Sequence, residues 1–279
     1  MPNLRRKVIS QTKSGIRSAI DQTCHLFPAI LGRVAYRLLT NAAILEHLPA
    51  RAVAQLRQTL VSSDETGYRQ ECFSQEGEDL VVARMIGERA NGFYVDVGAH
   101  HPIKYSNTFL LYKRGWRGIN IDATPGSMAL FDQLRPRDIN IERLIASDPS
   151  PHTFHLFNEP ALNTASSVLA KLRPSESDSF KIIETVTLTP NTLASILDEH
   201  MPRDQLIDVM SIDVEGFDLD VLASNDWDRY RPALLLIELL DTKLHDLGRH
   251  EIARFLGLKD YHPVSKIYNT VIFQTKRTR

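Results

Sequence analysis

Residues 92–102 read GFYVDVGAHHP: an apolar run ends in an acid and a glycine, and two histidines follow. The almost continuous apolar letters of residues 93–97 predict a buried strand. Gly98 stands where the chain must turn sharply, and its missing side chain would let a ligand approach the backbone. A dinucleotide-binding loop would continue with two more glycines, whereas this chain has His100 and Pro102 there. The stretch therefore predicts an α/β fold that binds a nucleoside without a pyrophosphate.

The chain around this stretch alternates between strand-like and helix-like segments. Strands are predicted at residues 93–97, 118–122, 139–145, 206–212 and 233–237, and helices at residues 77–87, 106–112, 127–134, 192–199, 217–222 and 252–256. Two further β-like runs cover residues 153–157 and 182–188, and residues 261–264 and 270–274 can pair as a terminal hairpin. The alternation predicts a largely parallel sheet with helices on both faces, to which the hairpin adds one antiparallel strand at the edge.

Four of the predicted strands end in an acidic residue, namely Asp96, Asp122, Asp213 and Glu238. In open α/β sheets, ligands bind beyond the carboxyl ends of the strands. Asp122 is placed to accept both hydroxyls of a ribose. S-adenosylmethionine has such a ribose, an adenine for the next strand end and a cation that Asp96 would attract. A single aspartate at a strand end is also common as a helix cap or turn residue, and that alternative stays open.

The overall composition excludes some classes of partner and site. The net charge is −1, which gives no electrostatic reason to expect nucleic acid as a partner. The only cysteines, Cys24 and Cys72, form neither a disulfide framework nor a zinc site, which favours a reducing, cytoplasmic location. No signal-peptide core follows the basic start, and no apolar run approaches the ~20 residues of a membrane-spanning helix.

The first part of the chain differs from the rest. We predict a helical N-terminal extension over residues 1–68 and a main domain over residues 69–279. Residues 1–70 hold ten Lys or Arg against four Asp or Glu, and apolar residues recur at helical spacing between residues 30 and 60. The extension either packs on the main domain as a cap or contacts a membrane surface or partner through its basic side chains. The sequence does not indicate an oligomeric state.

Several short motifs occur in an order that resembles one family. They are FSQEGED at residues 73–79, YVDVGA at 94–99, GWRGINID at 115–122, SIDVEG at 211–216 and Asp226-Trp227. Together they resemble the FkbM-type methyltransferases over about residues 72–240. The resemblance implies a class I, Rossmann-like methyltransferase fold that uses S-adenosylmethionine and has a seven-stranded sheet whose last strand is antiparallel.

The resemblance also implies which residues bind the cofactor. Asp96, Gly98 and Ala99 match the family's first cofactor motif, and Asp122 matches its ribose-binding acid. The segment that flanks adenine is matched by Ala146, Ser147 and Asp148. Gln75, Glu78 and Asp79 match a segment expected to close over the cofactor, although two acids in a first helical turn are also favoured by the helix dipole. His100-His101-Pro102 departs from the commoner VGANxG form of the first motif.

The catalytic candidates lie at the far strand end and on the loop after Gly98: Asp213, Glu215, His100 and His101. Asp213 could accept the proton of an acceptor hydroxyl, and either histidine could act as a base or orient that hydroxyl. The same region could hold a divalent metal through Asp213 and Glu238, with Asp241, but a metal is not predicted. Alternatively, Asp213 caps the following helix and the histidines are turn residues.

These observations lead to a functional hypothesis with two alternatives. The leading one is an S-adenosylmethionine-dependent O-methyltransferase that acts on a hydroxyl of a sugar, glycolipid or secondary metabolite. A nicotinamide-dependent oxidoreductase is the second reading, which the missing glycines disfavour. The third is a non-catalytic nucleoside-binding module whose basic N-terminal helices dock on a membrane or an assembly.

Overall fold

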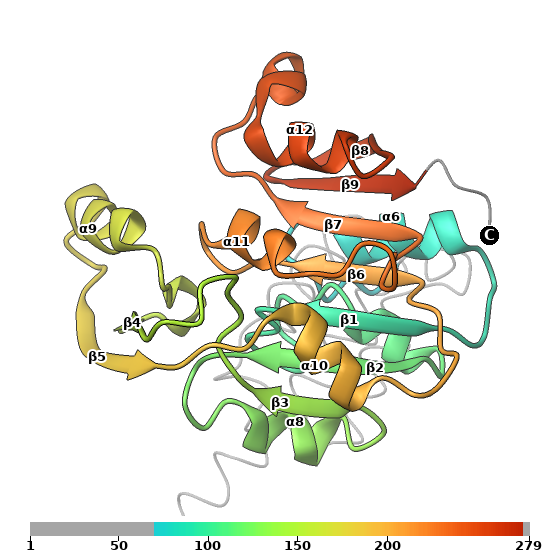
Figure 1. Cartoon of the computed structure of the whole chain (residues 1–279), viewed down its shortest axis with the longest axis horizontal. Coiled ribbons are helices and arrows are strands. Elements are labelled where there is room, and N and C mark those ends of the chain that lie inside the picture. Colours follow the sequence, from blue (N-terminus) through green and yellow to red (C-terminus); the bar gives the residue numbers. More distant parts are fainter. Residues whose placement is uncertain (1–69, 276–279) are drawn as a thin grey trace, which may run out of the picture. The chain divides into compact units, whose positions relative to one another are not determined.

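A seven-stranded sheet forms the centre of the computed structural model, which describes residues 70–275 (Figure 1). The strand order is β3-β2-β1-β6-β7-β9-β8. The bounds are β1 Phe93–Val97, β2 Arg117–Asp122, β3 Ile139–Glu142, β6 Val209–Ile212, β7 Leu234–Glu238, β8 Tyr261–Ile267 and β9 Thr270–Thr275. All pairs from β3 to β7 are parallel. The predicted Rossmann-like methyltransferase sheet is confirmed. The helical extension predicted for residues 1–68 lies outside the described residues.

The terminal hairpin forms, but its antiparallel strand is not at the edge as predicted. β9 pairs antiparallel with β7 on one side and with β8 on the other, so β8 is the edge strand. Residues Val271, Ile272 and Phe273 of β9 are fully buried, as suits a strand between two neighbours. β8 contains Pro263 beside a register shift, a residue that an edge strand tolerates.

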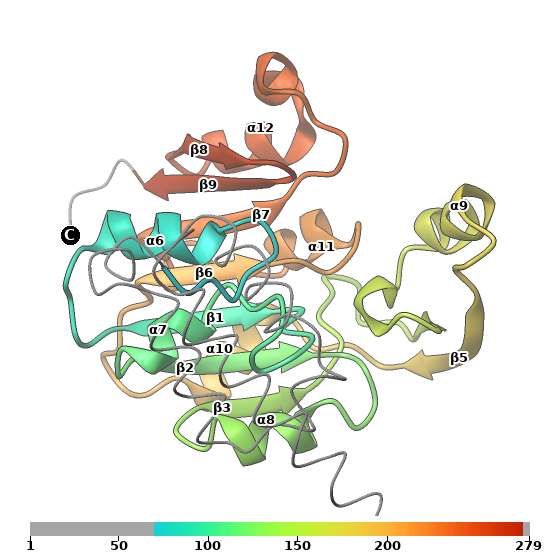
Figure 2. The same ribbon diagram turned by 180° about the vertical axis from the view of Figure 1, so that it is seen from behind.

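Helices cover both faces of the sheet, as the alternation predicts. α10 (Leu193–His200), α11 (Asp218–Ala223) and α12 (Glu251–Gly257) pack on one face, in a core with side chains such as Val95 and Val97 of β1. α6 (Glu78–Ile86) and α7 (Phe109–Lys113) pack on the opposite face against Tyr94 (Figure 2). α8 (Met128–Leu134) follows β2 and contacts β3. Within the described residues, no helix is both long and apolar enough to cross a membrane.

A separate arm, residues 152–188, projects from the sheet (Figure 1). It contains the two predicted β-like runs, now β4 (His152–Phe157) and β5 (Ile182–Leu188), which pair with each other antiparallel. Between them lie the short 3₁₀ helix η1 (Pro160–Leu162) and α9 (Ser167–Glu176), a helix that the sequence pattern did not predict. α9 begins where the Ser166 hydroxyl accepts the amide of Leu169, and it contains Pro174, which masked its helical character.

Two strands are shorter than predicted, and this moves the residues beyond them. β3 ends at Glu142 rather than at residue 145, and Ile145 instead pairs with Asn191 in an isolated bridge. β6 begins at Val209 rather than at residue 206, and Leu206 is 60% exposed. Because β1, β2 and β6 are parallel, their carboxyl ends nevertheless lie along the same edge of the sheet, where the candidate site is found.

Candidate active site

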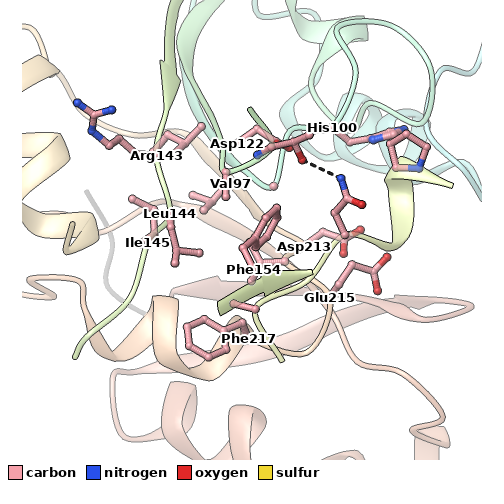
Figure 3. Close-up of a pocket in the computed structure, with 18 of the residues that line it drawn as sticks. Val97, His100, Asp122, Arg143, Leu144, Ile145, Phe154, Asp213, Glu215 and Phe217 are labelled. Carbon is pink, nitrogen blue, oxygen red and sulfur yellow. Dashed lines mark hydrogen bonds between the residues drawn. The ribbon is translucent and has the colours of Figure 1, made fainter. Parts of the chain in front are cut away.

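Two adjoining cavities open at the carboxyl ends of the strands. The first, which we call the strand-end cavity, has a volume of about 530 Å³ and is lined from the ends of β1, β2 and β6 and from the arm (Figure 3). The second, the acidic cavity, has a volume of about 660 Å³ and reaches from β6 toward α6 and the β8–β9 hairpin. Both are lined by the same five residues where they meet: Gly98, His100, Ala161, Asp213 and Glu215.

Gly98 forms the tight turn that separates β1 from the cavities. Its φ of +82° lies in the left-handed region, and a Cβ there would stand 1.8 Å from the carbonyl oxygen of Asp213. The amides of Gly98 and Ala99 donate to the carbonyl oxygen of Ile121 at 2.9 and 3.1 Å. The turn is therefore held against the ends of both neighbouring strands, β2 and β6.

Asp122 ends β2 and lines the strand-end cavity, where its side chain is 7% exposed. One carboxylate oxygen accepts the amide of Thr124 at 2.7 Å, and the other accepts the amide of His100 at 2.8 Å. A carboxylate has about four acceptor positions, so two are left for a ligand. The buried acid beside apolar walls, which include Leu144, Phe154 and Phe217, suits a nucleoside with two ribose hydroxyls.

Three carboxylates gather where the two cavities meet. Asp213 follows β6, Glu215 lies two residues further on, and Glu238 ends β7, and ligand oxygens of all three lie within 4.8 Å of one another. One oxygen of Asp213 and one of Glu238 are buried and have no hydrogen-bond partner among the described residues. This arrangement suits either a shared proton or a bound cation, and the set could hold a divalent metal. Asp241 lines neither cavity.

Crowding of these carboxylates changes their acidity. Burial, and then the charges of Glu238 and Glu215, raise the pKa of Asp213 well above its ordinary value. Burial and the charges of Glu215 and Asp218 raise the pKa of Glu238 to about 8. Asp213 and Glu238 are within hydrogen-bonding reach of each other, so near neutral pH the pair retains a proton.

The arm supplies an ion-pair partner for Glu215. Arg173 of α9, which is 6% exposed, donates both to the Glu215 carboxylate and to the carbonyl oxygen of Leu162. The backbone of Glu215 has a φ of +57°, and its carbonyl oxygen accepts the Thr164 hydroxyl at 2.8 Å. Nothing in the sequence indicated that Arg173 belongs to the site, because Arg173 and Glu215 are 42 residues apart in the chain and only the fold of the arm brings them together.

The family model described as Methyltransferase FkbM domain matches residues 96–262 of the chain. The chain belongs to the FkbM methyltransferase family. The resemblance drawn from the sequence motifs is thereby confirmed, and a methyltransferase is favoured over the nicotinamide-dependent alternative. A search of curated proteins finds no match.

In this FkbM methyltransferase, Asp213 does not cap α11, because the N-cap residue is Phe217 and no side chain caps the helix. The Asp218 carboxylate accepts the amides of Val214 at 3.2 Å and of Gly216 at 3.1 Å. Burial raises the pKa of Asp218 to about 7. Asp213 is therefore left to face the two cavities.

The two histidines take different positions. His100 lines both cavities, with a φ of +52°, and burial lowers the pKa of its imidazole. His101 lines neither cavity. Its Nδ1 accepts the amides of Ile103 at 3.0 Å and of Lys104 at 2.9 Å, which makes it the turn residue of the alternative reading.

Two residues predicted from the first cofactor motif point away from the cavities. Asp96 is buried on the α7 side of the sheet, where it accepts the Thr108 hydroxyl at 2.6 Å. Burial raises the pKa of Asp96. Ala99 packs in a small core with Met128 and Phe131. Side chains alternate along a strand, so Asp96 and Val97 face opposite sides. The structure thus gives Asp96 no direct approach to a cofactor cation.

The segment beyond β3 lines the strand-end cavity three residues earlier than predicted. Arg143, Leu144 and Ile145 line it, and Arg143 lies at the end opposite His100 and Glu215 in Figure 3. Ala146 is buried, Ser147 donates through its amide and hydroxyl to Asp220, and Asp148 accepts from Ser150, so none of these three lines the cavity. The shift follows from β3, which ends at Glu142 rather than at residue 145.

The segment before β1 is split between the site and the scaffold. Gln75 and Glu78 line the acidic cavity, and one Glu78 oxygen accepts the Thr270 hydroxyl of β9 at 3.1 Å. Asp79 is fully buried, where it accepts the amide of Phe73 at 2.7 Å and the hydroxyl of Ser74 at 2.8 Å. Asp79 therefore stabilises the turn before α6 and does not face a ligand.

Proposed function

We propose that this FkbM methyltransferase uses S-adenosylmethionine and methylates a hydroxyl oxygen of a small-molecule or glycan acceptor. The observation that carries the proposal is the junction of the two cavities at Gly98 and Asp213. A nucleoside in the strand-end cavity would place its reactive end at this junction. An acceptor in the acidic cavity would reach the same point from the other side.

The residues at the strand-end cavity suit the nucleoside part of this cofactor. Asp122 offers its remaining acceptor positions to a ribose, and the segment Arg143 to Ile145, with Phe154, would surround the base. Gly98 has no side chain to obstruct the approach of a ligand to the backbone. The carboxylates at the junction favour a cation there.

In this proposal, Asp213 takes the proton of the acceptor hydroxyl. S-adenosylmethionine, when bound, supplies a methyl group that is activated by a positively charged sulfur. As the acceptor oxygen forms its bond to carbon and the carbon–sulfur bond breaks, the hydroxyl proton passes to the Asp213 carboxylate. A base with a raised pKa suits this role, because it holds the proton more strongly than an ordinary carboxylate. In this step the proton that the pair retains lies on Glu238, which leaves Asp213 ionised and able to accept the hydroxyl proton.

Calorimetry with S-adenosylhomocysteine tests the choice of cofactor. We expect binding by the intact chain, and Asp122→Ala should weaken it at least ~10-fold because the ribose hydroxyls lose their acceptor. Asp148→Ala is the matched control, since the structure places Asp148 outside the cavity. Absence of binding by folded protein, or equal losses in the two variants, would contradict the proposed site.

Asp213→Asn tests the base. The amide cannot take a proton, so we expect the rate of methyl transfer to fall by about 100-fold or more, while S-adenosylhomocysteine affinity changes by less than ~3-fold. Asp228→Asn removes a charge from an exposed position and serves as the control. Unchanged turnover in Asp213→Asn would exclude this residue from the mechanism.

A further inference from the structure

The wall of the acidic cavity carries an excess of negative charge. Among the described residues that line it, five are carboxylates and none is Lys or Arg: Glu76, Glu78, Asp213, Glu215 and Glu238. The other polar lining side chains are the amides of Gln75, Asn107 and Asn269, the hydroxyls of Thr270, Tyr105 and Tyr268, and the imidazole of His100. Recognition of a phosphate or carboxylate normally uses Arg, Lys or free backbone amides, and this lining supplies no such cation.

Positive groups near the cavity are already engaged. Arg173 pairs with Glu215, and Lys104 lies outside the lining with its ammonium 4.5 Å from the centre of the Tyr105 ring. The start of α6 offers little to an anion, because Asp79 accepts the amide of Leu80 at 2.8 Å and two acids stand in the first turn. A negatively charged ligand would therefore meet repulsion without a compensating partner.

The carboxylate oxygens of the acidic cavity are hydrogen-bond acceptors, so they suit a ligand that carries donors. Each ionised carboxylate of the lining can only accept hydrogen bonds. Two aromatic rings lie at the rim: Tyr105, which is 46% exposed, and Tyr268, which is 73% exposed. Both residues have a positive φ, an unusual backbone conformation for a bulky side chain that is often found at ligand sites. Exposed rings beside acceptor groups suit a ligand with apolar C–H surface and many donors.

We propose that the acceptor is a polyol that carries an amino group and no phosphate or carboxylate. The inference rests on the proposed function and names the class of its acceptor. The charge of S-adenosylmethionine and the Arg173 guanidinium do not offset all five carboxylates. An ammonium group on the acceptor supplies further positive charge and up to three donors.

Three forms of one sugar test this inference with the intact chain. The acceptors are an aryl 2-amino-2-deoxyglucoside, its N-acetyl form and its 6-phosphate, each incubated with radiolabelled S-adenosylmethionine. We expect kcat/KM for the amine to exceed that for the N-acetyl form by about 10-fold, and the phosphate to be lower by a further ~10-fold or more. The preference should shrink as the salt concentration rises.

The outcomes separate this inference from the proposed function. Preference for the neutral or phosphorylated sugar, or transfer to none of the three while S-adenosylhomocysteine binds, overturns the amine assignment and leaves the cofactor proposal standing. Failure to bind S-adenosylhomocysteine overturns the proposed function itself. Transfer to the amine nitrogen, located by NMR of the product, contradicts O-methylation and supports the acceptor class.

A variant at the rim isolates the effect of charge. Glu76 is exposed and lines the acidic cavity, so Glu76→Gln should reduce the preference for the amine over its N-acetyl form by about 3-fold, chiefly through KM. Glu184→Gln removes the same charge from the exposed strand β5 of the arm and should leave the preference unchanged. Equal effects in the two variants, or no effect of Glu76→Gln, would contradict the charge argument.

Discussion

Gly98 tolerates no side chain, because its turn is wedged against the end of β6. Gly98→Ala would strain a φ of +82° and push a methyl group into the Asp213 carbonyl, so we expect the free energy of unfolding to fall by about 2–3 kcal/mol more than in a strained but open turn. Gly126→Ala is that comparison, since Gly126 has a φ of +80° and nothing within 4 Å of its missing Cβ. Urea denaturation of both variants measures the difference. Equal losses would show that the contact with Asp213 is unimportant.

Among the candidate residues that were chosen from their positions in the sequence, some line the cavities and others do not. Asp122 and Asp213 were found because each stands at the carboxyl end of a strand, and these ends meet along one edge of the parallel sheet. Asp96 also lies near a strand end, but it precedes Val97, the last residue of β1. Because side chains alternate between the two faces of a sheet, Asp96 faces α7 rather than the cavities. His101 is adjacent to His100, yet its ring folds back on its own turn. Side-chain direction, rather than residue type, separates these pairs.

Among the elements, α9 connects the arm to the cluster of Asp213, Glu215 and Glu238. Leu169 lies against Gly216, where a Cβ would stand 2.7 Å from its side chain, and Arg173 pairs with Glu215. The arm therefore fixes the loop that follows Asp213. The two β-like runs of the arm were predicted, but α9 was not, and neither was its contact with this loop.

Arg173→Gln tests the connection between α9 and the site. The change leaves the partly buried Glu215 without its ion-pair partner, so we expect a loss of about 2–3 kcal/mol in stability and faster hydrogen exchange in residues 167–176. Methyl transfer should also slow. Lys171→Gln removes a charge from an exposed position of the same helix and provides the control. If hydrogen exchange in α9 is the same in both variants, the ion pair does not hold the arm.

At the scale of the whole molecule, the buried carboxylates predict how stability depends on pH. The pKa of Glu238 is about 8 in the folded chain and near its ordinary value of 4.5 when unfolded. Between these values the native state binds more protons than the unfolded chain, so stability falls as the pH rises. From pH 7 to pH 9 we expect a fall of about 1 kcal/mol from this residue. His100 does not interfere, because its pKa is lowered from 6.5 and its effect lies below this window.

Denaturation at pH 7, 8 and 9 measures this effect. Glu238→Gln should flatten the dependence, because the amide does not titrate and its neighbour Asp213 loses a repelling charge. The difference between wild type and variant cancels the contribution of groups that do not interact with Glu238, and it retains the coupled titration of Asp213. A stability that rises between pH 7 and pH 9, or a variant with the same slope as the wild type, would exclude the shared proton.

The sequence by itself determined the sheet and the family. Runs of apolar residues predicted the buried strands. The glycine and the acids at the strand ends indicated tight turns and ligand contacts, because ligands bind at the carboxyl ends of parallel strands. It also indicated a hairpin, but not that β9 would lie inside the sheet and β8 at the edge. Strand order depends on long-range pairing, which a local pattern does not encode.

Only the tertiary structure decided which residues share the site. It gathered Asp213, Glu215 and Glu238 from two strand ends, added Arg173 from an arm with no recognisable motif, and moved the lining beyond β3 to residues 143–145. Each of these outcomes depends on where a strand ends or on which way a side chain points. Sequence spacing fixes neither, because packing against distant elements sets both.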